Sequence, residues 1–257
     1  MEKKFGDFKY PYPGPAHDPV KRDNVSEPRN SPHFQNGKTR RETFVTRYIL
    51  LVIFLATSSH AQQGMPDCQQ PDAISGAEKI NPFRISQRYF SALVGAEVSY
   101  RRCLEGLPPV AENASVRMIA EDHAKWMSDN KTLTHEPERP GYRKLSDRFA
   151  RGGLRYRRIG ENLALVSRFK VDQYRRFRVN NAQACSFSTR NGRPIGPHSY
   201  TSLARYVVDL WMKSPGHARN LLNPTFEEHG AAVKFDPHDK YCGRFYISQN
   251  FRDSLEK

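Results

Sequence analysis

The sequence predicts an α+β fold in which helices come first and a short antiparallel sheet closes the chain. Two observations support this expectation. Apolar residues recur at helical spacing in several segments between residues 81 and 222, and two alternating segments near the C-terminus flank a turn. The chain has 257 residues, of which 37% are hydrophobic, and this is enough for one modest core with long polar additions.

The helices are recognised by their apolar faces and by the residues that end them. Apolar residues at intervals of three or four line one face of the three longer predicted helices. His123 and Trp211 lie on such faces and are interpreted as core residues. Glycine or proline follows every segment except 115–128 and ends it. The expected helices cover residues 81–104, 115–128, 144–150, 201–213 and 217–222.

The closing sheet is predicted from alternation. Residues 230–235 and 241–251 flank the turn Asp236-Pro237-His238-Asp239, and this is the pattern of a β-hairpin. In the second strand Phe245, Ile247, Gln249 and Phe251 share one face. Residues 168–198 are basic and polar, and no element is assigned to them.

The N-terminal residues indicate export. A basic stretch precedes an apolar run over residues 48–56 and the small-x-small pattern Ser59-His60-Ala61. This layout is typical of a signal peptide over residues 44–61, and it predicts a secreted or periplasmic protein. A retained membrane anchor is the alternative, although the run is short for a membrane span.

Residues 1–43 are rich in proline and lack a periodic apolar pattern, so they are expected to be a disordered extension. Either the reading frame is overextended and the true start lies near Val45, which we favour, or the segment is a cytoplasmic tail. Residues 62–80 are interpreted as a polar leader to a single domain over residues 81–253.

All four cysteines lie beyond the expected cleavage site, at Cys68, Cys103, Cys185 and Cys242. An even count in an exported segment indicates two disulfides, for which three pairings are possible. We favour Cys185 with Cys242, because this bond would join the long polar insertion to the last strand. No Cys-x-x-Cys pair is present to indicate a zinc or redox site.

The formal net charge of +14 is spread along the chain rather than gathered in one block. No zinc-finger, RNA-recognition or homeodomain pattern accompanies it, so no specific nucleic-acid partner is expected. The basic groups are interpreted as solvated faces, with an anionic envelope surface as the alternative partner. They are Arg155, Arg157 and Arg158, and Arg175, Arg176 and Arg178.

Three motifs occur in a specific order. They are Ala120-x-x-His123-x-x-x-Met127 with Leu133-Thr134-His135, then Ile159-Gly160-Glu161-Asn162-Leu163, then Trp211-x-x-Ser214-Pro215-Gly216-His217-x-x-Asn220-Leu221-Leu222. Gly230 and Tyr246-x-x-Gln249-Asn250-Phe251 follow them. With these motifs the chain resembles bacterial members of the CAP superfamily, the cysteine-rich secretory proteins, over roughly residues 85–251.

The resemblance implies an α-β-α sandwich, in which a three- or four-stranded antiparallel sheet lies between helical layers. It also implies a surface cleft where two histidines and one or two glutamates converge. These positions are His135, His217 and Glu161 in this sequence. Ser214 stands where other members have the second glutamate, so the acidic set is incomplete here.

Two neutral imidazoles and one carboxylate are suitable direct ligands for a divalent cation, zinc above all, with a position left open for water. Such an ion could turn its bound water into a nucleophile. Glu161 could equally serve a structural role by holding backbone N–H groups of a neighbouring loop. Asn162 is interpreted as a bridge between backbone segments, and His198 and His229 as residues that bind no ligand.

The sequence therefore predicts an exported CAP-domain protein whose His/Glu cleft binds a divalent cation or a small lipid or peptide ligand. A metal-dependent hydrolase acting on peptide or cell-envelope material and a structural envelope-adhesion protein are the alternatives. No Gly-x-Ser-x-Gly or His-Glu-x-x-His motif supplies a catalytic nucleophile or base. Ser214 is interpreted as a helix-end hydrogen-bonding residue. Binding is accordingly favoured over catalysis.

Overall fold

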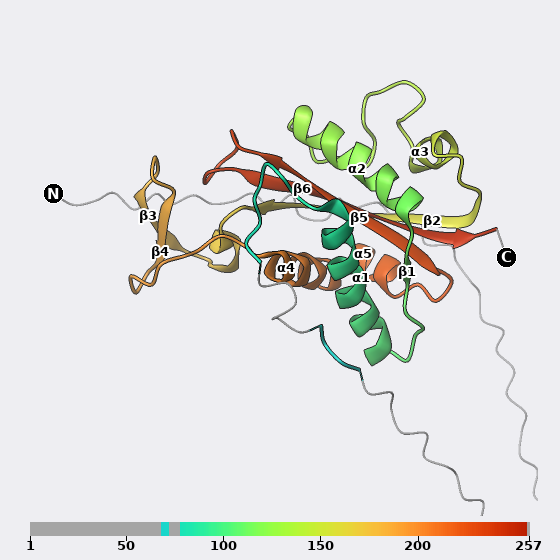
Figure 1. Ribbon diagram of the computed structural model, residues 1–257, viewed down its shortest axis with the longest axis horizontal. Coiled ribbons are helices and arrows are strands. Elements are labelled where there is room, and N and C mark those ends of the chain that lie inside the picture. Colours follow the sequence, from blue (N-terminus) through green and yellow to red (C-terminus); the bar gives the residue numbers. More distant parts are fainter. Residues whose placement is uncertain (1–67, 72–77, 256–257) are drawn as a thin grey trace, which may run out of the picture. The chain divides into compact units, whose positions relative to one another are not determined.

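The computed structural model describes residues 68–71 and 78–255 (Figure 1). The predicted extension over residues 1–43 and the predicted signal peptide over residues 44–61 lie outside these ranges. In the ranges that are described, no helix is both long and apolar enough to cross a membrane.

The domain is built on a four-stranded sheet with the strand order β1-β5-β6-β2. Strands β5 (Glu228–Asp236) and β6 (Arg244–Ser254) form the predicted hairpin, and β6 also pairs antiparallel with β2 (Tyr156–Ser167). The expectation of an antiparallel sheet needs one correction, because β1 (Ala111–Glu112) runs parallel to the start of β5. A strand of two residues is too short for alternation to show in the sequence.

Helices cover both faces of this sheet, as the α-β-α expectation requires (Figure 1). On one face α1 (Gln87–Leu104) and α4 (Tyr200–Met212) build the main apolar core together with α5 (Pro215–Leu221). On the other face lie α2 (Ala114–Asp129) and α3 (Leu145–Arg151). The first helix starts later than predicted because Ser86 caps it by accepting a hydrogen bond from the Tyr89 N–H.

The segment left unassigned in the sequence contains a short 3₁₀ helix, η1 (Lys170–Gln173), and a separate hairpin of β3 (Phe177–Asn181) and β4 (Ser186–Thr189). Cys185 at the start of β4 is bonded to Cys242, which confirms the favoured pairing. The second disulfide joins Cys68 to Cys103 at the end of α1. Two disulfides in a domain of this size are typical of proteins from oxidising compartments.

Close packing of α2 on the sheet generates the first prediction. A Cβ atom added at Gly230 in β5 would lie 2.1 Å from the backbone nitrogen of Arg117 in α2. Because backbone cannot move aside as a side-chain end can, Gly230→Ala should destabilise the domain by about 3 kcal/mol in urea unfolding. Gly196→Ala is the matched control, since a Cβ there meets nothing within 4 Å. Equal midpoints for the two variants would contradict this account of the packing.

A second prediction concerns acid stability. His229 is 1% exposed, and burial lowers its pKa to about 4. An unfolded histidine has a pKa near 6.5, so the unfolded state binds the proton more readily and stability is lost as the pH falls from about 6.5 to about 4. This one group accounts for on the order of 3 kcal/mol over that window. No hydrogen bond joins either His229 ring nitrogen to the described residues, so a leucine can replace it without losing one.

The measurement is urea unfolding of His229→Leu at pH 7 and pH 4.5. The variant should lose less stability between the two pH values than the parent chain does. The control is His238→Leu, which removes an exposed histidine. An acid sensitivity that stays the same in His229→Leu would show that His229 is not its source.

Candidate functional site

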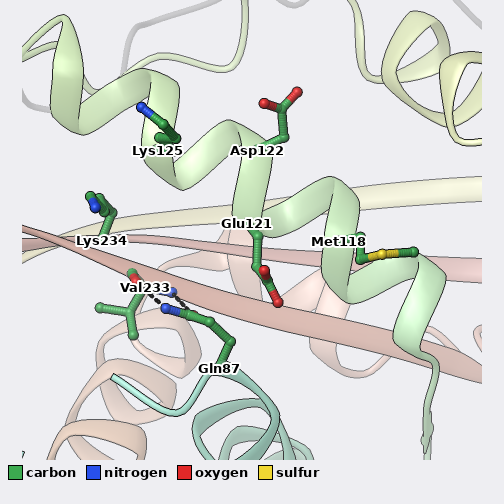
Figure 2. Close-up of a pocket in the computed structure, with 7 residues that line it drawn as sticks. All are labelled: Gln87, Met118, Glu121, Asp122, Lys125, Val233 and Lys234. Atoms are coloured by element: carbon green, nitrogen blue, oxygen red, sulfur yellow. Dashed lines mark hydrogen bonds between the residues drawn. The ribbon is translucent and has the colours of Figure 1, made fainter. Parts of the chain in front are cut away.

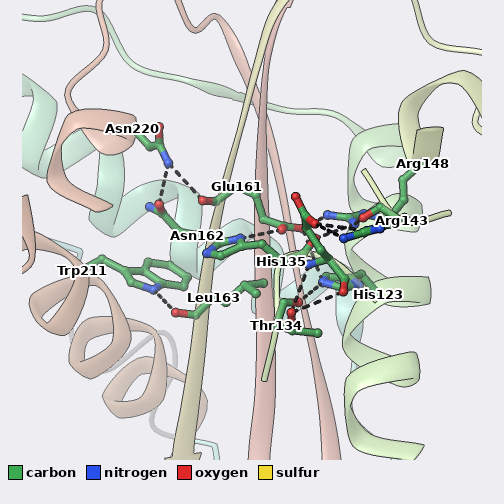
Figure 3. Close-up of polar contacts among 11 residues, drawn as sticks. His123, Thr134, His135, Arg143, Arg148, Glu161, Asn162, Leu163, Trp211 and Asn220 are labelled. Atoms are coloured by element: carbon green, nitrogen blue, oxygen red, sulfur yellow. Dashed lines mark hydrogen bonds and ion pairs between the residues drawn. The ribbon is translucent and has the colours of Figure 1, made fainter. Parts of the chain in front are cut away.

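The candidate site is organised by a buried ion pair between α3 and β2. Arg148 Nη2 donates to Glu161 Oε2 at 2.5 Å, and the two side chains are 0% and 4% exposed. The other carboxylate oxygen, Glu161 Oε1, lies 2.8 Å from Nδ1 of His135 (Figure 3). One buried carboxylate therefore holds both a guanidinium and an imidazole, and the imidazole side chain is 56% exposed to solvent.

The same arginine also binds the backbone of the loop that carries His135. Arg148 Nη1 donates to the backbone carbonyl oxygens of His135, at 3.1 Å, and of Arg143, at 3.4 Å. Two guanidinium groups contact the buried Tyr142 ring, with Arg139 at 4.7 Å and Arg148 at 5.6 Å from its centroid. Arg148 is thus the common partner of the strand carboxylate and of the loop backbone.

His123 is buried on the apolar side of α2, as predicted, but it also supports the site. Its Nε2 lies 3.0 Å from the carbonyl oxygen of Thr134 and 3.7 Å from Glu161 Oε2. A carbonyl can only accept, so Nε2 carries the proton. Burial lowers the pKa of His123 to about 4, with the charge of Arg148 adding to this effect and that of Glu161 opposing it. His123 is therefore a neutral donor that holds the residue before His135.

A second network ties the opposite helical layer to the same strand. Asn220 Nδ2 in α5 donates to the Glu161 carbonyl at 3.0 Å and to Asn162 Oδ1 at 2.9 Å. Asn162 Nδ2 donates in turn to the carbonyl of His217 at 3.3 Å, and this confirms its predicted bridging role. The indole N–H of the core residue Trp211 donates to the Leu163 carbonyl at 2.9 Å (Figure 3).

Of the predicted site residues, His135 and Glu161 are in direct contact beside the edge strand β2. β2 is the last strand in the sheet order, so the His135 loop and α5 reach the same strand from opposite faces. His217 is half-buried, and its pKa is lowered first by burial and then by the charge of His135. Arg148 and Asn220, which hold this arrangement together, were not singled out from the sequence.

One sequence interpretation is corrected by this geometry. Ser214 is the N-cap residue of α5, but its side chain makes no capping hydrogen bond, so its hydroxyl is not the helix-end group expected. Within residues 68–71 and 78–255, no group of three or more His, Cys, Asp and Glu side chains is arranged to hold a metal ion. Both carboxylate oxygens of Glu161 have protein partners in this structure.

Two hollows of the described domain are not lined by the predicted site histidines. A groove of about 390 Å³ runs between α2 and β5 (Figure 2). A smaller hollow of about 240 Å³ is lined by Tyr142 and Arg148 behind the His135 loop. Neither is lined by His135 or His217. The groove is lined by Gln87, Met118, Glu121, Asp122, Lys125, Val233 and Lys234.

Comparison with known proteins identifies the family. The model of the CAP family, described as the cysteine-rich secretory protein family, matches residues 78–251, and the chain belongs to this family. The comparison with curated proteins found no match.

Three solved bacterial structures are similar to part of this chain at low identity. An extracellular protein with an SCP domain from Bacillus anthracis is 22% identical, with a TM-score of 0.41, and the match covers 65% of this chain and 41% of that one. An outer surface protein from Borrelia burgdorferi is 14% identical, with a TM-score of 0.44 and coverage of 65% and 96%. A cysteine-rich secretory protein from Staphylococcus aureus is 15% identical, with a TM-score of 0.40 and coverage of 66% and 40%. This chain thus spans about two fifths of the first and third proteins.

The buried ion pair generates a prediction about stability. Arg148→Met removes the partner of a buried carboxylate, and such losses typically cost roughly 3–5 kcal/mol. Arg151→Met, an exposed change on the same helix, should be nearly neutral in urea unfolding. Adding Glu161→Gln to Arg148→Met should restore part of the loss, because the unpaired charge is then gone. A double variant that is no more stable than Arg148→Met would contradict the charge explanation.

Proposed function

We propose that this CAP domain binds a divalent cation, with zinc preferred, through the imidazoles of His135 and His217. The observation that carries the proposal is the 2.8 Å contact between His135 Nδ1 and the buried Glu161 carboxylate. A carboxylate accepts the Nδ1 proton, which leaves the lone pair of Nε2 for an ion. Metal-binding histidines almost always donate their other ring N–H to such a group. Glu161 would then orient the metal ligand His135 without binding the ion itself.

The donor set fits such an ion in charge and in type. Arg148 neutralises Glu161, and His217 has a lowered pKa, so its imidazole is neutral at pH 7. Neutral imidazoles suit zinc, copper and nickel better than the oxygen-seeking magnesium and calcium. Two protein ligands leave the remaining positions to water or to a small ligand. The Ser214 hydroxyl, which caps no helix, is a further polar group for a lipid or peptide ligand of the cleft.

Binding is proposed in preference to hydrolysis because of what Glu161 already does. A metal-dependent hydrolase needs a base to take a proton from the attacking water. Glu161, the one carboxylate that the sequence places in the cleft, is paired to Arg148 and lies against His135. Export of the domain is part of the proposal, since its two disulfides form in an oxidising compartment.

The test is calorimetric titration of the full chain with zinc chloride and, separately, with magnesium chloride. Zinc should bind with a stoichiometry of one, and His135→Ala or His217→Ala should each weaken binding at least about tenfold. His238→Ala, which removes an exposed histidine away from the cleft, is the matched control. Glu161→Gln should weaken zinc binding about 10–100-fold, as is typical of residues that orient a ligand.

Two results would overturn the cation site. One is zinc binding that survives in the His135→Ala, His217→Ala double variant, and the other is equal loss of zinc binding in His238→Ala. If the parent chain binds no divalent ion, the same variants tested against lipid vesicles and short peptides decide whether the cleft takes an organic ligand instead.

A further inference from the structure

The β3–β4 hairpin carries an unusual charge composition. Residues 173–208 contain six arginines and no lysine, aspartate or glutamate. Arg205 pairs with Glu97 in α1. The others are exposed, and no ion pair joins any of them to a carboxylate of the described residues. These five, which we call the hairpin arginines, are Arg175, Arg176, Arg178, Arg190 and Arg193.

The hairpin arginines are held on a rigid support although their charges repel one another. The Cys185–Cys242 disulfide ties β4 to the turn before β6. Phe177 and Phe187 pack edge-to-face with Tyr241, with ring centroids 5.1 and 6.2 Å apart. Aromatic packing and a covalent bond therefore hold the cationic surface in place before any partner arrives.

Exposed apolar side chains lie among these charges. Tyr174 is 40% exposed and Val179 is 50% exposed, and they flank Arg175, Arg176 and Arg178 along the chain. Arginine matches phosphate oxygens with two parallel hydrogen bonds, which lysine cannot do. Tyrosine and aliphatic side chains gain free energy when they enter the boundary between lipid headgroups and acyl chains.

We infer that the β3–β4 hairpin docks the domain on a bilayer that contains anionic phospholipids. The hairpin arginines would bind lipid phosphates, while Tyr174 and Val179 would enter the headgroup region. A soluble phosphate polymer would satisfy the arginines equally well but would give Val179 nothing to bury against, and so the bilayer is favoured. The hairpin and α3 lie at opposite ends of the described domain (Figure 1), so docking would leave the His135 cleft open. This inference is independent of the proposed cation site.

The experiment is co-sedimentation of the full chain with phosphatidylcholine vesicles at increasing NaCl. The vesicles either lack phosphatidylglycerol or contain about 30% of it, enough anionic lipid for basic segments to bind. Each arginine at an anionic surface contributes about fivefold to binding. The triple variant Arg175→Gln, Arg176→Gln, Arg178→Gln should therefore bind anionic vesicles on the order of 100-fold more weakly. Arg84→Gln, Arg88→Gln, Arg151→Gln removes the same charge from exposed positions elsewhere and should bind as the parent chain does.

A second comparison separates the bilayer from a soluble polyanion. Val179→Ser should weaken binding to anionic vesicles, while binding of the chain to inorganic polyphosphate should be unaffected by this change. The inference is overturned if both triple variants lose binding equally or if neither does. It is also overturned if Val179→Ser leaves vesicle binding unchanged, because a phosphate polymer would then explain the hairpin arginines as well as a bilayer does.

Discussion

The candidate cleft depends on the ion pair between Arg148 and Glu161. Both side chains are almost fully buried, where an isolated charge would be costly, so each requires the other. Arg148 uses a second nitrogen to bind the backbone of the His135 loop, and Glu161 uses its second oxygen to hold the His135 ring. Satisfying the buried charges thus fixes a loop with little apolar packing of its own. A buried pair of this kind need not add net stability, but it strongly disfavours other arrangements of the loop.

The alternation of β2 explains how two helical layers bond to one strand. Successive side chains of a strand point to opposite faces of the sheet. Glu161 points toward α3 and the His135 loop, whereas Asn162 points toward α5 and bonds the His217 backbone and Asn220. Because β2 is an edge strand, residues that bond to its opposite faces can still meet beside it. Two consecutive residues of β2, Glu161 and Asn162, are therefore enough to bond to both helical layers.

Features with a local signal could be predicted from the sequence, and features that depend on distant partners could not. Helical periodicity located α2 and α4 and placed His123 and Trp211 in the core, and the order of the motifs pointed to His135 and Glu161, which are in contact. Nothing local distinguishes the buried Arg148 from the exposed Arg151 in the same helix, because the burial of Arg148 follows from Glu161 in another element. The β3–β4 hairpin escaped notice because its exposed arginines leave no apolar alternation to detect.

The two functional regions are stabilised by different physical means. The candidate site lies on a sheet covered by helices on both faces, with the largest apolar core on the face opposite Arg148 and Glu161. The hairpin has only a small cluster around Val171, Phe187 and Ile195, and small clusters of this kind usually need a covalent staple. The Cys185–Cys242 disulfide supplies this staple. It joins the hairpin to the turn between the central strands β5 and β6 and not to the edge strand β2. A partner bound to the hairpin would therefore fix the position of the whole domain without changing the geometry around Glu161.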